Sequence, residues 1–70
     1  MDKIINVQDY IELNAFLKKV GLASSGGQAK NIIRSGVISV NGNVETRNKK
    51  KLHDNDVVGF KGKKYVVKTK

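Results

Sequence analysis

Hydrophobic residues recur with helical spacing in the first half of the chain. Four of them fall at positions i, i+3, i+4 and i+7, which places them on one stripe of a helix: Leu13, Phe16, Leu17 and Val20. Gly21 follows directly, and glycine is a common residue at the end of a helix. Ahead of this helix, the β-favouring run KIINV at residues 3–7 predicts either a short strand or a loosely ordered arm.

A second helix is predicted between Ser24 and Gly36. Ser25 and Gln28 have the spacing of a capping box, in which a hydroxyl and an amide satisfy unpaired backbone N–H groups of the first turn. Gly36 suits the left-handed residue that ends a helix. The apolar stripe of this helix consists of Ala29, Ile32 and Ile33.

After Gly36 the pattern changes from helical to alternating. The segment VISV, the pair Asn41-Gly42 and the segment NVET predict a β-hairpin, because both central positions of its turn favour positive φ. Further turns are predicted at HDND, before VVGF, and at KGKK, before YVVK. We therefore expect an α+β fold, in which two short helices pack on one face of a small, mainly antiparallel sheet of three to five strands.

A chain of 70 residues has room for one domain, residues 1–70, with a core too small to enclose a deep substrate pocket. There is no cysteine, and His53, beside Asp54 in a predicted turn, is the lone histidine. These features predict a protein without a metal site, a cofactor or catalytic residues. The acidic N-terminus and the lack of a long apolar run favour a soluble, cytoplasmic protein.

Basic residues are concentrated in the later part of the chain. Fourteen Lys and Arg residues oppose six Asp and Glu residues, giving a net charge of +8, yet charges balance within residues 1–23. All of the excess lies after residue 23, where a positive field would attract a polyanion such as a nucleic acid. The alternative is that the lysines only keep the protein soluble.

Three groups of cations are candidates for such contacts. Lys30 and Arg34 lie one helical turn apart, away from the apolar stripe, where their mutual repulsion would become attraction beside a phosphate backbone. A connection predicted to be extended and mobile, suited to following phosphates, carries Arg47, Lys49, Lys50 and Lys51. Each group has an ordinary solvated surface as its alternative, and that alternative is favoured for Lys61, Lys63 and Lys64.

The start of the second helix and the aromatic residues suggest weaker sites. Gly26-Gly27 lacks the spacing of a nucleotide-binding loop, but the first amides of the helix are placed to hold one backbone phosphate. The core is the expected location of Phe16, Phe60 and Tyr65. Base stacking is therefore not expected to be the main mode of binding.

The segment FLKKVGLASSGGQAKNIIRSGVISVNGNVETRNKKKLHDNDVV resembles the S-four RNA-binding domain, whose core is the alpha-L motif, over roughly residues 13 to 60. Its matching features are the first helix ending at Gly21-Leu22 and then, in order, Ser25, Ala29, Lys30, Ile33, Gly36, Val40, Asn41, Gly42 and Asp56. The resemblance implies that the second helix and the following strands bind structured RNA by its shape and backbone. Many members have arginine after the motif serine, where this chain has Gly26, as the small stand-alone bacterial members do.

These observations together predict a monomeric, non-enzymatic RNA-binding protein that recognises ribosomal RNA or transfer RNA in ribosome assembly or translation. The residues expected to contact RNA are Ser25, Gly26, Gly27, Gln28, Lys30, Arg34, Arg47, Lys49, Lys50 and Lys51. The alternatives are an adaptor that docks on an acidic ribosomal or RNA-processing protein, and a targeting subunit of a separate RNA-modifying enzyme. DNA binding is a weaker variant.

Overall fold

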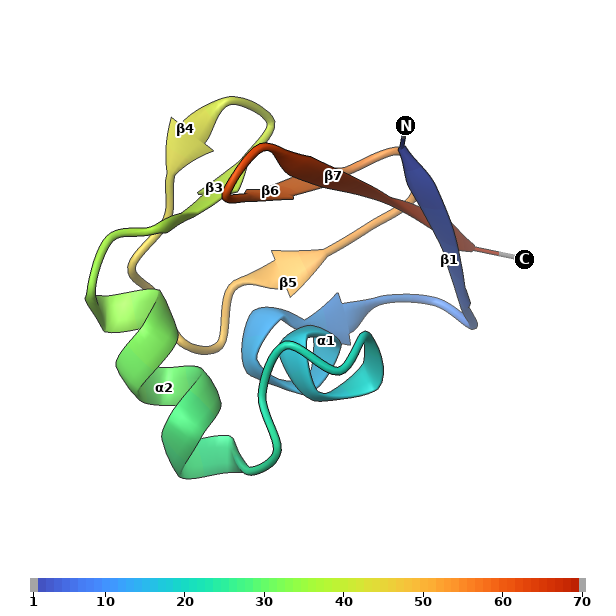
Figure 1. Cartoon of the computed structure of the whole chain (residues 1–70). Helices are drawn as coiled ribbons and strands as arrows, with labels where there is room; N and C mark the ends of the chain where they lie inside the picture. The colour runs from blue at the N-terminus through green and yellow to red at the C-terminus, as the bar shows by residue number, and fades with distance from the viewer. Residues whose placement is uncertain (1, 70) are drawn as a thin grey trace.

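Both helices lie on the same side of a five-stranded β-sheet in the computed structural model of the protein, which describes residues 2–69 (Figure 1). In chain order the elements are β1 (Lys3–Val7), β2 (Ile11–Glu12), α1 (Leu13–Lys19), α2 (Gly26–Arg34), β3 (Ile38–Val40), β4 (Asn43–Val44), β5 (Lys51–Leu52), β6 (Val57–Phe60) and β7 (Lys63–Thr69). The predicted α+β fold is confirmed.

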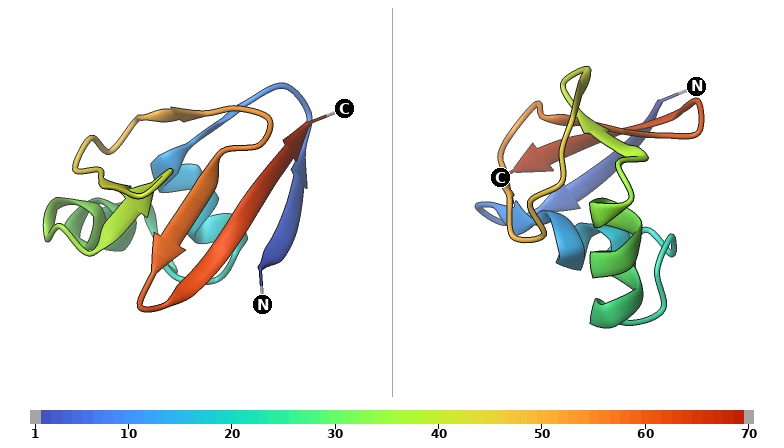
Figure 2. Two further views of the ribbon diagram at one scale, coloured as in Figure 1. Left: turned by 90° about the horizontal axis from the view of Figure 1, so that it is seen from above. Right: turned by 90° about the vertical axis from the view of Figure 1, so that its left-hand side faces the viewer.

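The five-stranded sheet has the order β1-β7-β6-β3-β4. Its neighbours are antiparallel except for β1 and β7, which run parallel with Lys3 opposite Tyr65 (Figure 2). The segment KIINV is thus a strand at the sheet edge and not a loose arm. Parallel strands need a long crossover, and here almost the whole chain lies between the two partners.

Helix α1 buries the stripe that its spacing predicts. Leu13, Phe16 and Leu17 are fully buried, and their helix ends before Gly21, which has φ of +82°. The ring of Phe16 meets that of Tyr65 on β7 edge to face, with centroids 6.1 Å apart. Edge-to-face packing is a favourable geometry for aromatic rings, so this pair fastens α1 to the sheet.

Helix α2 begins and ends close to its predicted limits. Ser25 is the N-cap, and its Oγ accepts a hydrogen bond of 3.1 Å from the backbone N–H of Gln28. The Gln28 side chain accepts from the backbone N–H of Ser24 at 2.6 Å, one residue earlier than in the usual reciprocal box. Gly36 has φ of +83°, which terminates the helix as predicted.

Both predicted hairpin turns have left-handed central residues. Asn41 and Gly42 have φ of 52° and 86° between β3 and β4, and Lys61 and Gly62 have φ of 49° and 81° between β6 and β7. Positive φ at both central positions is the backbone of the turn that matches strand twist. The hairpin predictions are confirmed.

A second, two-stranded sheet was not predicted. The antiparallel strands β2 and β5 pair Ile11 with Leu52, and Leu52 is fully buried. The prediction of a mobile basic connection is wrong in this respect, because its last lysine, Lys51, belongs to β5. The residues before it are also hydrogen-bonded: Lys50 and Asn48 accept backbone N–H groups of α1.

The core lies between the helices and the sheet. Its buried members outside α1 are Ala23, Ala29, Ile33, Ile38, Val40, Leu52, Val58, Tyr65 and Val67. Phe60, expected in the core, is half-buried and packs against this cluster, with Lys61 Nζ 5.3 Å from its ring centroid. Two of the three aromatic residues assigned to the core are therefore fully inside it.

The hairpin turn at Asn41 is fastened to the turn before β6 by Asp56. One carboxylate oxygen of Asp56 accepts from the Asn41 side-chain amide at 3.0 Å, and the other accepts from the backbone N–H of His53 at 2.7 Å. The Asn41 side-chain oxygen accepts from the backbone N–H of Val57 at 2.9 Å. These bonds join two loops far apart in the sequence.

We expect Asp56→Ala to lower the free energy of unfolding by about 1 to 2 kcal/mol, because two hydrogen bonds to a carboxylate are lost at a half-buried site. Urea denaturation followed by circular dichroism measures this change. Asp9→Ala is the control, since it removes the same charge from an exposed residue. Equal stability of the two variants would contradict a structural role for Asp56.

Candidate nucleic-acid interface

The start of α2 is shaped by two side chains that were predicted to contact RNA. Ser25 and Gln28 form the capping bonds described above, so both act first in setting the helix start. Gly26 and Gly27 form the first turn, are exposed, and have open space where a Cβ atom would stand. Within residues 2–69 their backbone N–H groups have no acceptor, which leaves two donors directed away from the helix.

The exposed side of α2 carries the two predicted cations. Ala29 and Ile33 are fully buried on the side that faces the core. Lys30 and Arg34 are both exposed, and neither forms an ion pair within the described residues 2–69. The structure therefore presents a pair of uncompensated positive charges one helical turn apart.

Arg47, unlike Lys30 and Arg34, forms an ion pair. Its guanidinium donates to both carboxylate oxygens of Glu45, at 3.0 and 3.1 Å, and its backbone N–H also donates to that carboxylate. These bonds lower the pKa of Glu45 to about 2 and raise that of Arg47. The pair therefore stays charged at every pH above the acid range, and its attraction is lost only as the pH falls towards 2.

The basic loop, residues 45–50, is held against the start of α1. The carbonyl of Lys50 accepts from the backbone N–H of Leu13 at 2.8 Å, and that of Asn48 accepts from Asn14 at 3.0 Å. Lys49 is exposed and Lys50 is half-buried. Figure 1 shows the loop reaching from β4 towards the two helices, so its cations are carried on a fixed backbone.

A shallow polar hollow of about 360 Å³ lies between the basic loop, the β3–β4 hairpin and the turn after β5. It is lined by Val40, Asn41, Asn43, Glu45, Lys50, Lys51, His53 and Asp56. Its size is at the small end of the range for ligand sites. The hollow brings Lys50 and Lys51 together with polar side chains of the hairpin.

The predicted residues therefore fall into two groups. The start and exposed side of α2 carry Ser25, Gly26, Gly27, Gln28, Lys30 and Arg34, while the basic loop and β5 carry Arg47, Lys49, Lys50 and Lys51. The side chain that the sequence did not single out is Tyr10, which is 49% exposed beside Lys51. Tyr10 meets Lys51 because β2 pairs with β5, and strands of two residues are too short for an alternating hydrophobic pattern to predict that pairing.

Other kinds of site find little support in residues 2–69. This part of the chain contains no group of three His, Cys, Asp or Glu side chains placed to hold a metal ion. None of its helices combines the length and the apolar surface needed to cross a bilayer. His53 is an exposed residue beside a turn, and its backbone N–H donates to Asp56.

Sequence comparison places the chain among known proteins. A family model described as the S4 domain matches residues 4–68. A protein of Escherichia coli (strain K12), YbcJ, named as a candidate RNA-binding protein, is 42% identical over 53 residues, which is 76% of each chain.

Two solved structures share the fold. The solution structure of YbcJ from E. coli, described as revealing an alfaL motif involved in RNA-binding, has a TM-score of 0.67 and 34% identity, covering 97% of this chain and 86% of YbcJ. The crystal structure of the 30S ribosomal protein S4e from Thermoplasma acidophilum has a TM-score of 0.69 over 86% of this chain, at 20% identity. This chain spans about a third of that ribosomal protein (32%), so the likeness concerns the fold.

The order of helices and hairpins, the match over residues 4–68 and the likeness to YbcJ all agree with the expected alpha-L motif. The chain belongs to the S4 domain family.

Proposed function

We propose that residues 1–70 act as one RNA-binding domain that recognises structured RNA, either ribosomal or transfer RNA. The observation that carries this proposal is the pair of exposed cations Lys30 and Arg34, which form no ion pair with any residue from 2 to 69 and lie on the side of α2 that faces away from the core. Membership of the S4 domain family and the RNA-binding description of YbcJ support it. The protein would work as a cytoplasmic, non-enzymatic monomer in ribosome assembly or translation.

The start of α2 adds a site for one phosphate. The backbone N–H groups of Gly26 and Gly27 point out of the helix, and the partial positive charge of a helix N-terminus favours an anion there. Lys30 follows one turn later on the exposed side. A phosphate backbone that runs along α2 would meet the amides first and then Lys30 and Arg34.

The lysines of the basic loop and β5 would contact a second part of the RNA backbone. Lys49 and Lys51 are exposed and Lys50 lines the polar hollow, so all three can approach phosphates. Arg47 contributes less than its charge suggests because Glu45 neutralises it. Phosphate contacts from two fixed surfaces select a backbone shape more than a sequence.

Salt should weaken the proposed binding of RNA. If about six phosphate contacts form, raising the salt concentration from about 50 to about 200 mM should weaken binding about a thousandfold, because bound counterions are released from the RNA. Fluorescence anisotropy with labelled transfer RNA, repeated with a ribosomal RNA fragment, measures the slope. An affinity that hardly changes with salt would contradict binding through the phosphate backbone.

Charge reversal on α2 tests whether its exposed side contacts RNA. The double variant Lys30→Glu and Arg34→Glu should bind RNA at least about tenfold more weakly and show a shallower salt slope, because two phosphate contacts become repulsive. The control is Lys63→Glu with Lys64→Glu, which changes the net charge equally on the β6–β7 hairpin. Equal losses in both variants, with unchanged circular dichroism, would mean that net charge alone matters.

An arginine at position 26 would restore the side chain that many members of the family have there. A Cβ at Gly26 meets no atom within 4 Å, so Gly26→Arg should fold normally and strengthen RNA binding severalfold, with about one more phosphate contact in the salt slope. Gly26→Gln is the control for side-chain bulk without charge. If arginine gives no more affinity than glutamine, the start of α2 does not face the RNA.

A further inference from the structure

The two-stranded sheet presents aromatic and cationic side chains on its outer face. Leu52 of β5 is fully buried, so the pleat turns its neighbours Lys51 and His53 to the opposite face. Continuing the register in which Ile11 faces Leu52 places Tyr10 opposite His53. Residues from two distant segments thus form one exposed group.

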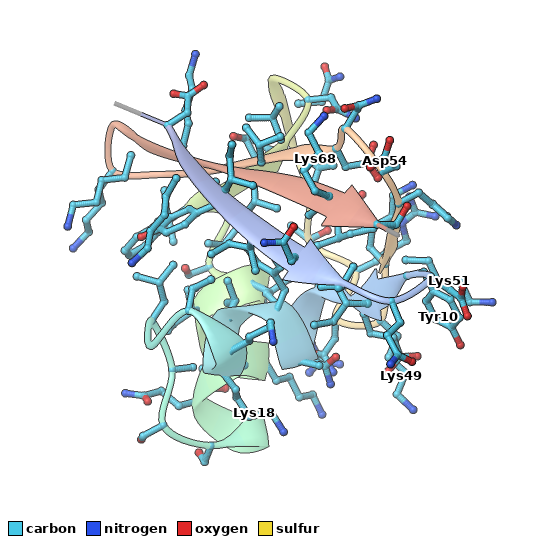
Figure 3. The ribbon with its side chains drawn as sticks, turned by 90° about the vertical axis from the view of Figure 1, so that its right-hand side faces the viewer. Tyr10, Lys18, Lys49, Lys51, Asp54 and Lys68 are labelled. Carbon is cyan, nitrogen blue, oxygen red and sulfur yellow. The ribbon has the colours of Figure 1, made fainter. Side chains whose placement is uncertain are left out.

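The geometry of this group is that of an aromatic pair with a cation beside it. The rings of Tyr10 and His53 have centroids 6.3 Å apart and are tilted by 37°, and Lys51 Nζ lies 5.0 Å from the centroid of the Tyr10 ring. Tyr10 is 49% exposed, more than any other Phe or Tyr residue of the chain. In Figure 3, Tyr10, Lys49 and Lys51 project from the same edge of the molecule.

We infer that Tyr10, His53 and Lys51 hold one unpaired nucleotide of the bound RNA, with its base stacked on the Tyr10 ring. This inference rests on the proposed function and adds a contact that is not made to the phosphate backbone. Every nucleobase has a π face that stacks on an aromatic ring. The Lys51 ammonium lies over the Tyr10 ring, and a base that stacks there would displace it towards the adjoining phosphate. The Tyr10 cluster, as we call these three residues, offers both.

The polar hollow lies next to the cluster and favours the same ligand. Lys51 and His53 belong to both, and Lys50 and the exposed Asn43 add a cation and an amide to the wall. The amide of Asn43 has a donor and an acceptor that suit a base edge or a ribose hydroxyl. A nucleotide stacked on Tyr10 would therefore find polar partners within the hollow.

Five carboxylates lie near the Tyr10 cluster and the polar hollow, and three of them accept hydrogen bonds from other groups of the protein. Glu45 is neutralised by Arg47, and Asp56 accepts hydrogen bonds from Asn41 and from the backbone of His53. Glu12, which lies opposite Lys51 in the β2–β5 register, is half-buried. Asp9 and Asp54 are exposed and adjoin Tyr10 and His53 in the sequence, and Asp54 accepts from the backbone N–H of Thr69. The lysines of the cluster and the hollow therefore share this edge with exposed acidic groups.

Binding of single-stranded RNA and of duplex RNA can be compared to test this inference, because only a single strand has unpaired bases to stack on Tyr10. The probes are an oligouridylate of about eight nucleotides, within the usual range of single-strand site sizes, an abasic oligomer of equal length, and a blunt RNA duplex. Tyr10→Ala should weaken binding of the oligouridylate roughly 5- to 150-fold, the range expected for one stacked base. Tyr10→Phe keeps the ring and should bind as the original protein does.

Tyrosine fluorescence gives a second readout at the same site. The chain has no Trp and two Tyr residues, so in a Tyr65→Phe variant the emission comes from Tyr10 alone. Stacking should quench this emission when the oligouridylate is added but not when the abasic oligomer is added. Quenching by both oligomers, or by neither, would overturn the inference.

The outcomes separate this inference from the proposed function. Loss of oligouridylate binding by Tyr10→Ala with unchanged duplex binding supports the Tyr10 cluster as a base site. Equal losses for the duplex and the oligouridylate, or no loss for either, overturn it while RNA binding itself stands. If the original protein binds neither of these probes nor transfer RNA or the ribosomal RNA fragment at low salt, the proposed function fails instead. Circular dichroism of each variant tests folding. If Tyr10→Ala unfolds, the quenching of Tyr10 emission in the Tyr65→Phe variant still decides the inference.

Discussion

The first turn of α1 depends on backbone carbonyl groups from the basic loop. Glu12, at the N-cap, makes no capping bond with its side chain, and the amides of Leu13 and Asn14 donate instead to Lys50 and Asn48. A helix of seven residues is too short to be stable alone in water, so it needs these acceptors as well as its buried side chains. Helix and loop therefore become ordered together.

This mutual dependence places the charged groups. Strand β2 ends where α1 begins, and β5 follows the loop directly. The hydrogen bonds from the first amides of α1 to the loop carbonyls therefore extend the β2–β5 ladder. Lys50 and Lys51 are thus fixed relative to α1, and Tyr10 is fixed relative to Lys51. The core is held by apolar packing on one side of these elements, which leaves the opposite side for cations and the exposed ring.

The elements predicted correctly are those whose signals are local. The stripe of α1, the cap at Ser25 and the pair Asn41-Gly42 each act within one turn of the chain, so spacing and residue type were sufficient. The parallel pairing of β1 with β7 and the pairing of β2 with β5 depend on residues far apart, and two-residue strands carry almost no periodicity. The candidate site divides in the same way. The exposure of Lys30 follows from the period of its helix, whereas the contact between Tyr10 and Lys51 depends on the pairing of β2 with β5.

Charge pairing was also beyond the sequence pattern. Arg47 was counted with the free lysines because its neighbours are basic, yet Glu45 lies two residues away and engages its guanidinium. Whether such near neighbours meet depends on the backbone between them, which here turns away from β4 to reach α1. The cluster of four cations is in effect three lysines and one neutral pair, so this segment presents fewer free cations than its four basic residues indicate.

A fixed basic loop also changes how recognition works. A mobile lysine-rich segment would lose conformational entropy on binding and would adapt to many backbones, whereas a loop already bonded to α1 has lost most of that freedom on folding. In the proposed complex its lysines, with Lys30 and Arg34 of α2, would then be charges at set positions, which favours RNA whose phosphates match them. Gly26 has no side chain, so the start of α2 presents only backbone amides. In the proposed complex more of the discrimination would therefore fall to the basic loop and to Tyr10 beside Lys51.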